Sequence, residues 1–439
     1  MPFKSLYKCP AIYRDLFIII VIIISIFTNA LARGSNEVLF TSVNCQDNHL
    51  SLPKDHGNKQ DSSLIYINTF IENGSDLNWE YIGDGTIIFD LAYDYERVTL
   101  NRAYEHWHFL LNARAGSDIT LIFQNFNEIY NGRSVPFDYS WSADCVVSPD
   151  GKKWRHTPAE WIEGNKMKVR VHMESDSLFV AQVEPYRLSD LQRLFSRIID
   201  DPRVKIISIG ESVERRKIHI IQVGHDDAPH RIFIRARAHP WEAGTNWVVE
   251  GIINTLLQHT DEVREFLDNY SVYILPMANI DGVVHGVTRF NMNGMDLNRN
   301  FTKPADPILS PENAAMEHWL EDMIAKGLKP DLAIDFHNDS NGNLSFASSG
   351  EKSEVYVRNM KSLENLVRNY SWFSESSSFD GSPAFEEGLM SRYGIDGLVY
   401  ELNAHWVKGL NKKPLSEDWL LLGKQLCKVF HEYFQEMSR

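Results

Sequence analysis

The chain has 439 residues, of which 43% are hydrophobic, and its formal net charge at pH 7 is −15. This length is enough for two domains that each bury a core. The acidic balance argues against nucleic acid and anionic membranes as general partners, because both carry negative charge, although local arginines could still hold an acidic ligand. The sequence contains no basic run, heptad array or repeat of fixed period.

The N-terminus has the pattern of an export signal. Three basic residues precede the apolar run 16–27, and the small-residue sequence ALA follows it at 30–32. This pattern predicts a signal peptide over residues 1–32, and therefore a periplasmic or extracellular protein with no stable membrane association after cleavage. The alternative is an uncleaved membrane anchor through residues 16–27, although about 12 residues is short of the roughly 20 that span a bilayer.

Cysteine usage permits at most one disulfide bond after signal cleavage. Of the four cysteines, Cys9 would leave with the signal peptide. The remaining three, Cys45, Cys145 and Cys427, allow one disulfide, such as Cys45–Cys145, and one buried thiol in an exported protein. Because the sequence has no C-x-x-C motif, we do not expect cysteine to bind a metal.

The region after the signal divides into a β-rich part and a mixed part. Residues 33–63 are polar and are expected to form an irregular lead-in. Short runs of alternating apolar residues follow, such as KMKVRVHM at 166–173, and clusters of turn-forming residues separate them. This pattern favours an antiparallel β-sandwich over residues 64–187. The stretch 188–200 has helical periodicity and opens a second domain, residues 188–439.

Apolar strand-like runs alternate with helical stretches in the second domain. The strand-like runs are 231–237, 271–277, 332–337 and 398–403, and the helical stretches are 246–259, 311–326 and 417–437. This alternation favours an α/β domain with a mixed central sheet flanked by helices. Ligands of such sheets bind beyond the carboxyl ends of strands, so functional residues are expected there.

Three candidate metal ligands stand at two of these strand ends. His239 and Glu242 form an H-x-x-E pair just after one strand, and His337 ends another. Imidazole nitrogens and carboxylate oxygens are common zinc ligands, and a catalytic zinc site uses three protein ligands. Taken alone, an H-x-x-E pair more often has no metal, and an isolated histidine is more often a structural hydrogen-bonding residue.

The segment 275–301 is rich in polar residues and has no apolar period. We expect a loop whose polar side chains find partners, the alternative being a solvent-exposed loop without a role. Its two arginines, Arg289 and Arg299, are suited to binding a carboxylate or to stabilising developing negative charge.

One glutamate stands near the end of an otherwise apolar strand. Burial of Glu401 in the run GLVYELN would be costly without a partner. It is interpreted either as a salt-bridged structural acid or as a general base that removes a proton from an attacking water.

Taken in chain order, these motifs resemble those of the zinc metallocarboxypeptidases of the carboxypeptidase A type, and within them the cytosolic carboxypeptidases. The resemblance extends over nearly the whole chain after the signal, because the β-rich region 64–187 is similar to the extra N-terminal domain of that subgroup. It implies that one zinc ion binds to His239, Glu242 and His337, and that Glu401 is the catalytic base.

The same resemblance assigns the polar loop to substrate binding. Arg289 matches the arginine that stabilises the oxyanion, and Asn298 and Arg299 match the pair that binds the terminal carboxylate of the substrate. Asp335, two residues before His337, would share a strand face with it. Asp335 is interpreted either as a partner that orients this histidine or as part of a structural salt bridge.

The stretch 377–394 is expected to shape the side-chain pocket. Tyr393 is the candidate for the tyrosine that covers the bound substrate in the family. Glu386 and Glu387 would favour a basic substrate residue if they faced the pocket, but we expect both to face solvent.

The combined prediction is a zinc-dependent carboxypeptidase that acts on a peptide or protein with a free C-terminal carboxylate. One alternative is a zinc deacylase of N-acyl amino acids of the aspartoacylase type, which shares the H-x-x-E…H arrangement but lacks the β-domain. The other is an inactive module that binds peptides through the β-domain. The presence of three ligands, a glutamate base and two arginines argues against this second alternative.

Overall fold

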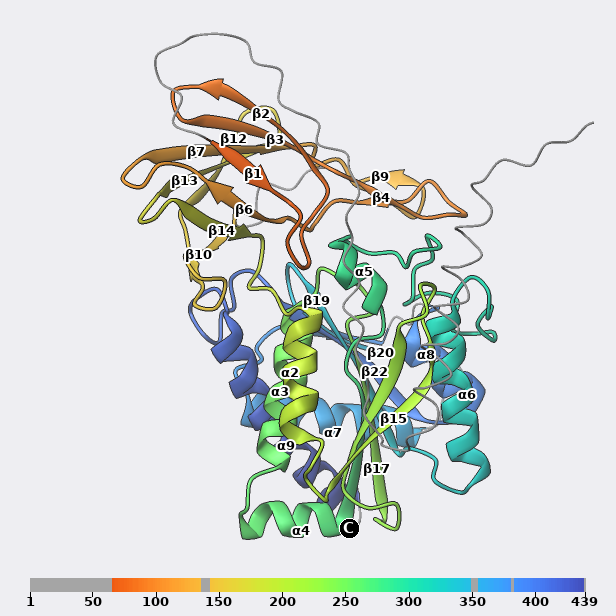
Figure 1. Ribbon diagram of the computed structural model, residues 1–439. Helices are drawn as coiled ribbons and strands as arrows, with labels where there is room; N and C mark the ends of the chain where they lie inside the picture. The colour runs from red at the N-terminus through yellow and green to blue at the C-terminus, as the bar shows by residue number, and fades with distance from the viewer. Residues whose placement is uncertain (1–64, 136–142, 349–353, 380–382, 438–439) are drawn as a thin grey trace, which may run out of the picture. The chain divides into compact units, whose positions relative to one another are not determined.

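The computed structural model describes residues 65–135, 143–348, 354–379 and 383–437 (Figure 1). The predicted signal peptide, the alternative anchor and the polar lead-in lie outside these residues. None of the described helices is long and apolar enough to cross a membrane. Of the cysteines, Cys145 and Cys427 are described and are buried thiols, whereas Cys45 is not described.

Two five-stranded sheets make up most of the first described region. The first sheet has the order β1 (Tyr66–Asn68), β6 (His108–Asn112), β14 (Ser177–Ala181), β10 (Val146–Ser148) and β11 (Arg155–His156). The second has the order β12 (Ala159–Ile162), β13 (Lys166–His172), β7 (Asp118–Gln124), β3 (Thr86–Leu91) and β2 (Leu77–Gly83). All neighbouring strands in these two sheets are antiparallel except β3 and β7, which run parallel.

The inward-facing side chains of both sheets form one core, so the predicted sandwich is confirmed, with one parallel pair as a departure. Buried and less buried residues alternate along β3, β7 and β13, as the sequence pattern predicts. Phe89 of β3 stacks on Phe109 of β6 in the facing sheet, with ring centroids 4.8 Å apart, and on Phe123 of β7 at 5.0 Å. Each of these buried rings contributes roughly 1.5–3 kcal/mol to stability.

A third, four-stranded sheet was not predicted, and we call it the small sheet. It has the order β4 (Asp94–Tyr95), β5 (Arg102–Ala103), β8 (Ile129–Tyr130) and β9 (Arg133–Ser134). Strands of two residues are too short to leave an alternating pattern in the sequence. Its importance lies in its contacts with the polar loop of the second domain, described below.

The second domain is built on one eight-stranded mixed sheet in the described part of the chain, which confirms the predicted fold class. Its order is β15 (Val204–Glu211), β16 (Lys217–Val223), β18 (Tyr270–Leu275), β17 (His230–Ala236), β19 (Leu332–Asp339), β22 (Asp396–Asn403), β20 (Asn343–Phe346) and β21 (Ser376–Ser378). The central strands β18, β17, β19 and β22 are parallel to one another, while β15 and β16 pair antiparallel at one edge.

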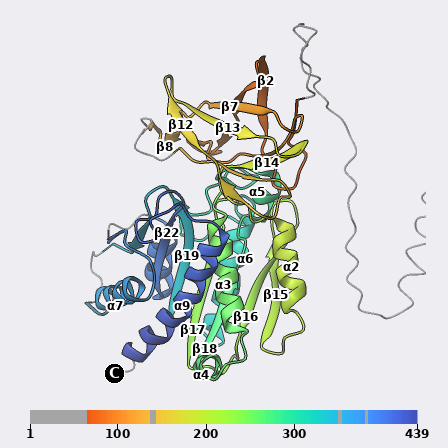
Figure 2. The same ribbon diagram turned by 90° about the vertical axis from the view of Figure 1, so that its left-hand side faces the viewer.

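Helices cover both faces of this sheet (Figures 1 and 2). One core holds side chains of α2 (Leu188–Ile198), α3 (Gly244–Leu256), α4 (Asp261–Asn269), α7 (Glu354–Tyr370) and α9 (Ser416–Met437). The opposite core holds side chains of α6 (Pro311–Ala325) and α8 (Phe385–Tyr393). As predicted, α6 begins at Pro311, where a missing N–H costs nothing.

Candidate metal centre and adjoining cavity

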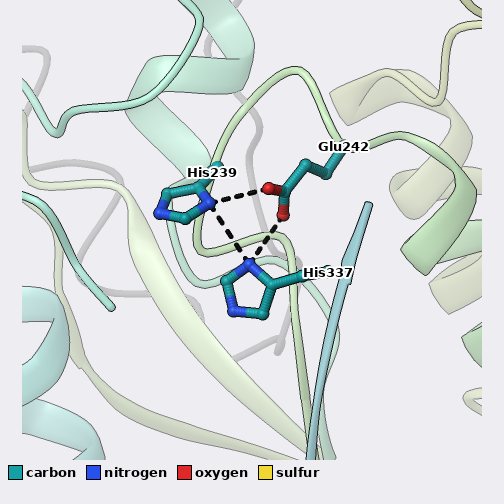
Figure 3. Close-up of side chains that lie close together, drawn as sticks. All are labelled: His239, Glu242 and His337. Atoms are coloured by element: carbon teal, nitrogen blue, oxygen red, sulfur yellow. Dashed lines mark hydrogen bonds and ion pairs between the residues drawn. The ribbon is translucent and has the colours of Figure 1, made fainter. Parts of the chain in front are cut away.

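Two neighbouring parallel strands bring the candidate metal ligands together. His239 lies three residues beyond the end of β17, Glu242 precedes α3, and His337 lies near the end of the adjacent strand β19. All three are buried, and one ligand atom from each lies within 4.8 Å of the others (Figure 3). The expected position beyond strand ends is therefore where the structure places them.

The spacing and chemistry of these atoms fit a zinc ion. The two Nδ1 atoms of His239 and His337 are 3.2 Å apart, and the oxygens of Glu242 lie 2.7 Å from the first and 2.9 Å from the second. Ligand atoms about 2.0 Å from a tetrahedral zinc are roughly 3.3 Å apart, so only shifts of a few tenths of an ångström are needed.

The electrostatics of the cluster favour a positive charge. Burial lowers the pKa of His337, but the charges of Glu242, Asp335 and Glu401 raise it, and the pKa ends well above its ordinary value. Burial raises the pKa of Glu242, but the two histidines lower it to about 2. The same negative charges that hold a proton on the imidazole attract a divalent cation.

A carboxylate holds the far side of each histidine ring. Nε2 of His337 donates to Oδ2 of Asp335 at 2.8 Å, and Nε2 of His239 donates to Oδ1 of Asp296 at 3.1 Å. Such partners fix the ring orientation and leave the opposite nitrogen free to bind a metal. Oδ1 of Asp335 also lies 3.6 Å from Nε of Arg235, its cross-strand neighbour. Asp335 therefore makes both of the interactions that the sequence offers as alternatives, since it orients His337 and forms a salt bridge.

The turn between the first two ligands is held by an arginine that sequence reasoning missed. Arg237 adopts a left-handed backbone conformation with φ of 61° and is fully buried. Its Nε donates to the carbonyl of Pro240 at 2.7 Å, and its Nη1 donates to Oδ1 of Asn246 at 2.8 Å. Burial lowers the pKa of this guanidinium to about 9. The signal available in the sequence was a charged residue at the end of an apolar strand.

Glu401 lies beside the candidate ligands. The parallel register of β19 and β22 places it directly opposite His337, so the two side chains share a face of the sheet. Among the residues that the structure describes, none forms an ion pair with Glu401. Burial raises the pKa of this carboxyl group to about 8, more than the positive charge of His337 lowers it. This environment suits a proton acceptor near neutral pH better than a structural salt bridge.

The polar segment 275–301 is a loop with many internal partners, interrupted by the short helix α5 (Ile280–His285), which we did not predict. The carboxylate of Asp296 accepts several of the hydrogen bonds that hold this loop together. Its Oδ2 accepts from Nε of Arg289 at 2.8 Å, and its Oδ1 accepts from the backbone N–H of Asn298 at 2.8 Å. One carboxylate therefore orients a candidate ligand histidine, a candidate oxyanion arginine and Asn298, the first residue of the predicted carboxylate-binding pair.

The small sheet supports the same loop from the other side. Oδ2 of Asp94 accepts from the backbone N–H groups of Arg289 at 2.6 Å and Phe290 at 2.9 Å. The backbone N–H of Arg97 donates to the carbonyl of Gly294 at 2.7 Å. Sequence reasoning missed these residues, because nothing in a local pattern shows that β4 meets a loop about 200 residues later.

Asn298 and Arg299 stand at the end of this loop. Nη1 of Arg299 donates to the carbonyl of Asn298 at 2.7 Å, and Nη2 of Arg299 donates to the hydroxyl of Tyr130 in β8. Oδ1 of Asn298 accepts from the backbone N–H of Phe385 at 3.1 Å, which leaves its amide nitrogen for another acceptor.

A cavity of about 260 Å³ joins His239, Glu242, Glu401, Arg289, Asn298 and Arg299, whereas His337 does not line it. The second domain lines it with His239, Trp241, Glu242, Arg289, Asn298, Arg299, Asn338, Asp339, Ser340, Glu401 and His405. The β-rich domain adds mainly aromatic and acidic residues, namely Tyr104, Glu105, Trp107, Phe126, Tyr130, Asp144, Trp161, Met167 and Gln182. The arrangement can hold a metal, a proton acceptor, an oxyanion and a carboxylate in one space.

The structure does not bring Tyr393 to this cavity. The Tyr393 hydroxyl accepts from Arg392 at 2.6 Å and donates to Glu321 at 3.1 Å, and the residue packs at the far end of α8. The expectation that Glu386 faces solvent is wrong, because this residue is fully buried. Glu387 accepts from the backbone N–H of Ser348 at 2.9 Å.

Comparisons with known proteins agree in finding similarity to carboxypeptidases. Residues 197–378 match the family model described as zinc carboxypeptidase. The chain is 29% identical over 136 residues to cytosolic carboxypeptidase 3 of Mus musculus, which is 29% of this chain and 14% of that protein. It is 28% identical over 227 residues to cytosolic carboxypeptidase 3 of Bos taurus, which is 45% of this chain and 22% of that protein. The chain thus spans less than a quarter of the length of these relatives.

Solved structures share the fold over most of the chain. A metallo-carboxypeptidase from Burkholderia cenocepacia superposes with a TM-score of 0.73 at 21% identity, covering 85% of this chain and 99% of that one. A metallo-carboxypeptidase from Pseudomonas aeruginosa, in complex with (2-guanidinoethylmercapto)succinic acid, has a TM-score of 0.69 at 21% identity. The match covers 84% of this chain and 99% of that one. Both matches extend well beyond residues 197–378, so the likeness includes much of the β-rich domain.

Proposed function

Because the chain belongs to the zinc carboxypeptidase family and is related to the cytosolic carboxypeptidases, we propose that it hydrolyses the last amide bond of a peptide or protein and releases one residue. The bond can belong to the main chain or to an amino acid attached through a side chain. The observation that carries this proposal is one cavity, lined by Glu401, Asn298 and Arg299, which opens onto His239 and Glu242 of the His-Glu-His group.

The residues of the chain have separate tasks in this reaction. A zinc ion, when bound, supplies a Lewis acid that acidifies water and polarises a carbonyl. The carboxylate of Glu401 takes the proton from the attacking water, and Arg289 donates hydrogen bonds to the developing oxyanion. Asn298 and Arg299 bind the terminal carboxylate of the substrate, which restricts cleavage to the end of a chain.

The direct test is a scan of synthetic peptides that differ in their C-terminal residue, with and without a chelator. We expect release of one residue, loss of activity with chelator and recovery with zinc. The variant Glu401→Gln should lose about 100-fold to 10,000-fold in rate while still binding peptide, because it keeps the shape of the side chain but cannot take a proton. Glu163→Gln, on an exposed turn, is the matched control and should retain full activity.

Two results would contradict the proposal. Hydrolysis of N-acyl amino acids without action on blocked dipeptides would assign the site to a deacylase. Purified protein without zinc, in which Glu401→Gln changes nothing, would indicate a peptide-binding module.

We also propose that the protein is exported, on the strength of its basic N-terminal residues, apolar run and ALA sequence. N-terminal sequencing of the protein from the cell exterior or periplasm should then begin at about residue 33. A membrane-bound protein that retains residues 16–27 would support the anchor instead.

A further inference from the structure

Tyr130 of the small sheet stands between the two arginines of the candidate substrate site. Its ring centroid lies 5.5 Å from the guanidinium carbon of Arg289 and 5.6 Å from that of Arg299, within cation–π range. Its hydroxyl accepts a hydrogen bond from Nη2 of Arg299, and the residue lines the cavity. One phenol from the β-rich domain therefore contacts both cationic groups of the site.

The direction of this hydrogen bond leaves the phenol proton available. A guanidinium has only donors, so the oxygen of Tyr130 is the acceptor and its own O–H points elsewhere. No acceptor for that O–H is present among the described residues. Arg299 likewise keeps further N–H groups, because its contacts with Asn298 and Tyr130 use one hydrogen on each terminal nitrogen. The unused donors of both residues can therefore serve one anionic group.

We propose that Tyr130 is a third binding residue for the terminal carboxylate of the substrate, beside Asn298 and Arg299. This inference rests on the proposed function. The guanidinium fixes the phenol oxygen, and the phenol O–H donates to a carboxylate oxygen that Arg299 also binds. A hydrogen bond to a charged partner is stronger than one between neutral groups, so the contact favours a free acid over an amide.

The proposal makes the β-rich domain part of the substrate site. Tyr130 precedes Arg299 by 169 positions and comes from a strand of only two residues. The same small sheet holds the backbone of Arg289 through Asp94. The preference for a chain end is thus shared between two domains.

The test compares peptide acids with the matching C-terminal amides. In Tyr130→Phe, which keeps the ring over both arginines, we expect kcat/KM for the acid to fall about 10-fold to 100-fold, mainly through KM. Dissociation constants measured by calorimetry in the Glu401→Gln background should show the same loss for the acid and no change for the amide. The acid should also raise the melting temperature of Tyr130→Phe less than that of the unmodified protein.

Tyr93→Phe is the matched control. The Tyr93 hydroxyl donates to the carbonyl of Asn125 at 2.6 Å, and the guanidinium of Arg102 lies 4.4 Å from its ring centroid, but Tyr93 does not line the cavity. It loses the same hydroxyl in the same domain, and we expect its discrimination between acid and amide to be unchanged.

Failure of the inference and failure of the proposed function give different results. If the protein releases terminal residues but Tyr130→Phe keeps full discrimination, or weakens acid and amide equally, the role of Tyr130 is overturned and the carboxypeptidase activity stands. If no residue is released from any peptide, the proposed function fails. In that case the calorimetric comparison of acid and amide still decides whether Tyr130 binds a carboxylate.

Discussion

Asp296 shows how much one buried carboxylate can organise. It accepts from His239, from Arg289 and from the backbone of Asn298. Burial raises its pKa, but the charges of Arg289 and His239 lower it well below its ordinary value, so it stays ionised. Its negative charge should make the imidazole of His239 a better metal ligand.

We therefore expect Asp296→Asn to weaken zinc binding about 10-fold to 100-fold, measured by competition with a chelator of known affinity. Asn keeps an acceptor, so the change removes the charge and little of the shape. Asp306→Asn is the control, because Asp306 accepts only from backbone N–H groups of an exposed turn. Equal zinc affinity in the two variants would show that Asp296 does not support the metal site.

A second prediction concerns the pH dependence set by Glu401. Only its ionised form accepts a proton, so activity should fall as the pH drops through its pKa, which burial raises towards 8 before a cation is bound. Asp339 raises this pKa further through its negative charge. Asp339→Asn should therefore move the acidic limb of the kcat/KM profile to lower pH, because the carboxylate of Glu401 then ionises more readily.

The measurement is kcat/KM for one peptide across pH 5 to 9. Asn at position 339 can still accept from the backbone N–H groups of Asn341 and Gly342, so the local turn is retained. An acidic limb that stays in place, or moves to higher pH, would contradict this account of Glu401.

At the scale of elements, the polar loop is positioned by its fit against the small sheet. Gly294 has φ of 73°, and a Cβ there would lie 3.0 Å from both the backbone nitrogen of Arg97 and the carbonyl oxygen of Tyr95. Only glycine allows this approach and this backbone conformation at low cost.

Gly294→Ala should push the loop away from the sheet and lower kcat/KM about 10-fold or more, because Arg289 and Asp296 move with it. The backbone strain alone costs about 1–2 kcal/mol in the free energy of unfolding. Gly327→Ala separates backbone strain from displacement of the loop, since Gly327 has φ of 74° and open space around it. Gly327→Ala should lose only the stability that backbone strain costs in urea unfolding and keep its activity, whereas Gly294→Ala should lose more stability and lose activity.

The sequence predicted those elements whose pattern is local. The central strands β17, β18, β19 and β22 are apolar runs with polar ends, so both their existence and the position of the ligands followed from periodicity. The small sheet could not be found in this way, because its strands have two residues each and are defined by pairing alone.

The site residues, too, could be predicted only where their pattern is local. His239, Glu242, His337 and Glu401 stand at strand ends, where their chemistry was recognisable. The roles of Asp296 and Tyr130 depend on contacts across 57 and 169 positions of the chain, which no local pattern records. The position of Tyr393 in the sequence suggests a pocket residue, but Tyr393 ends α8 and does not line the cavity.

At the scale of the molecule, an ion pair links the β-rich region to the region built on the eight-stranded sheet. Oδ1 of Asp144 lies 3.1 Å from Nζ of Lys413, and Nδ1 of His156 lies 3.0 Å from the same oxygen. Burial raises the pKa of Asp144, but the hydrogen bond from His156 and the charge of Lys413 lower it below its ordinary value. A folded-state pKa below the unfolded one means that this group stabilises the protein above pH of about 4 and that the contribution is lost in more acidic solution.

We expect Asp144→Asn to lower the free energy of unfolding by about 3 kcal/mol at pH 7, because it leaves a partly buried Lys413 without its anion. The difference from the unmodified protein should shrink as the pH falls below about 4, because Asp144 is protonated first in the unfolded chain and then, below its lowered pKa, in the folded protein. Urea unfolding at pH 7 and pH 3.5 measures both values. Asp176→Asn, at an exposed turn, is the control, and a constant difference at both pH values would contradict the assignment.

The volume of the cavity limits what can enter it. About 260 Å³ is less than the roughly 300–1,000 Å³ of sites that enclose drug-sized ligands, and its walls come from two domains. Under the proposed function, a protein substrate would be cut only where its last residues are unfolded enough to carry a carboxylate to Arg299. Susceptibility to this enzyme would then depend on the local disorder of a protein's tail, and partners that order the tail would protect it.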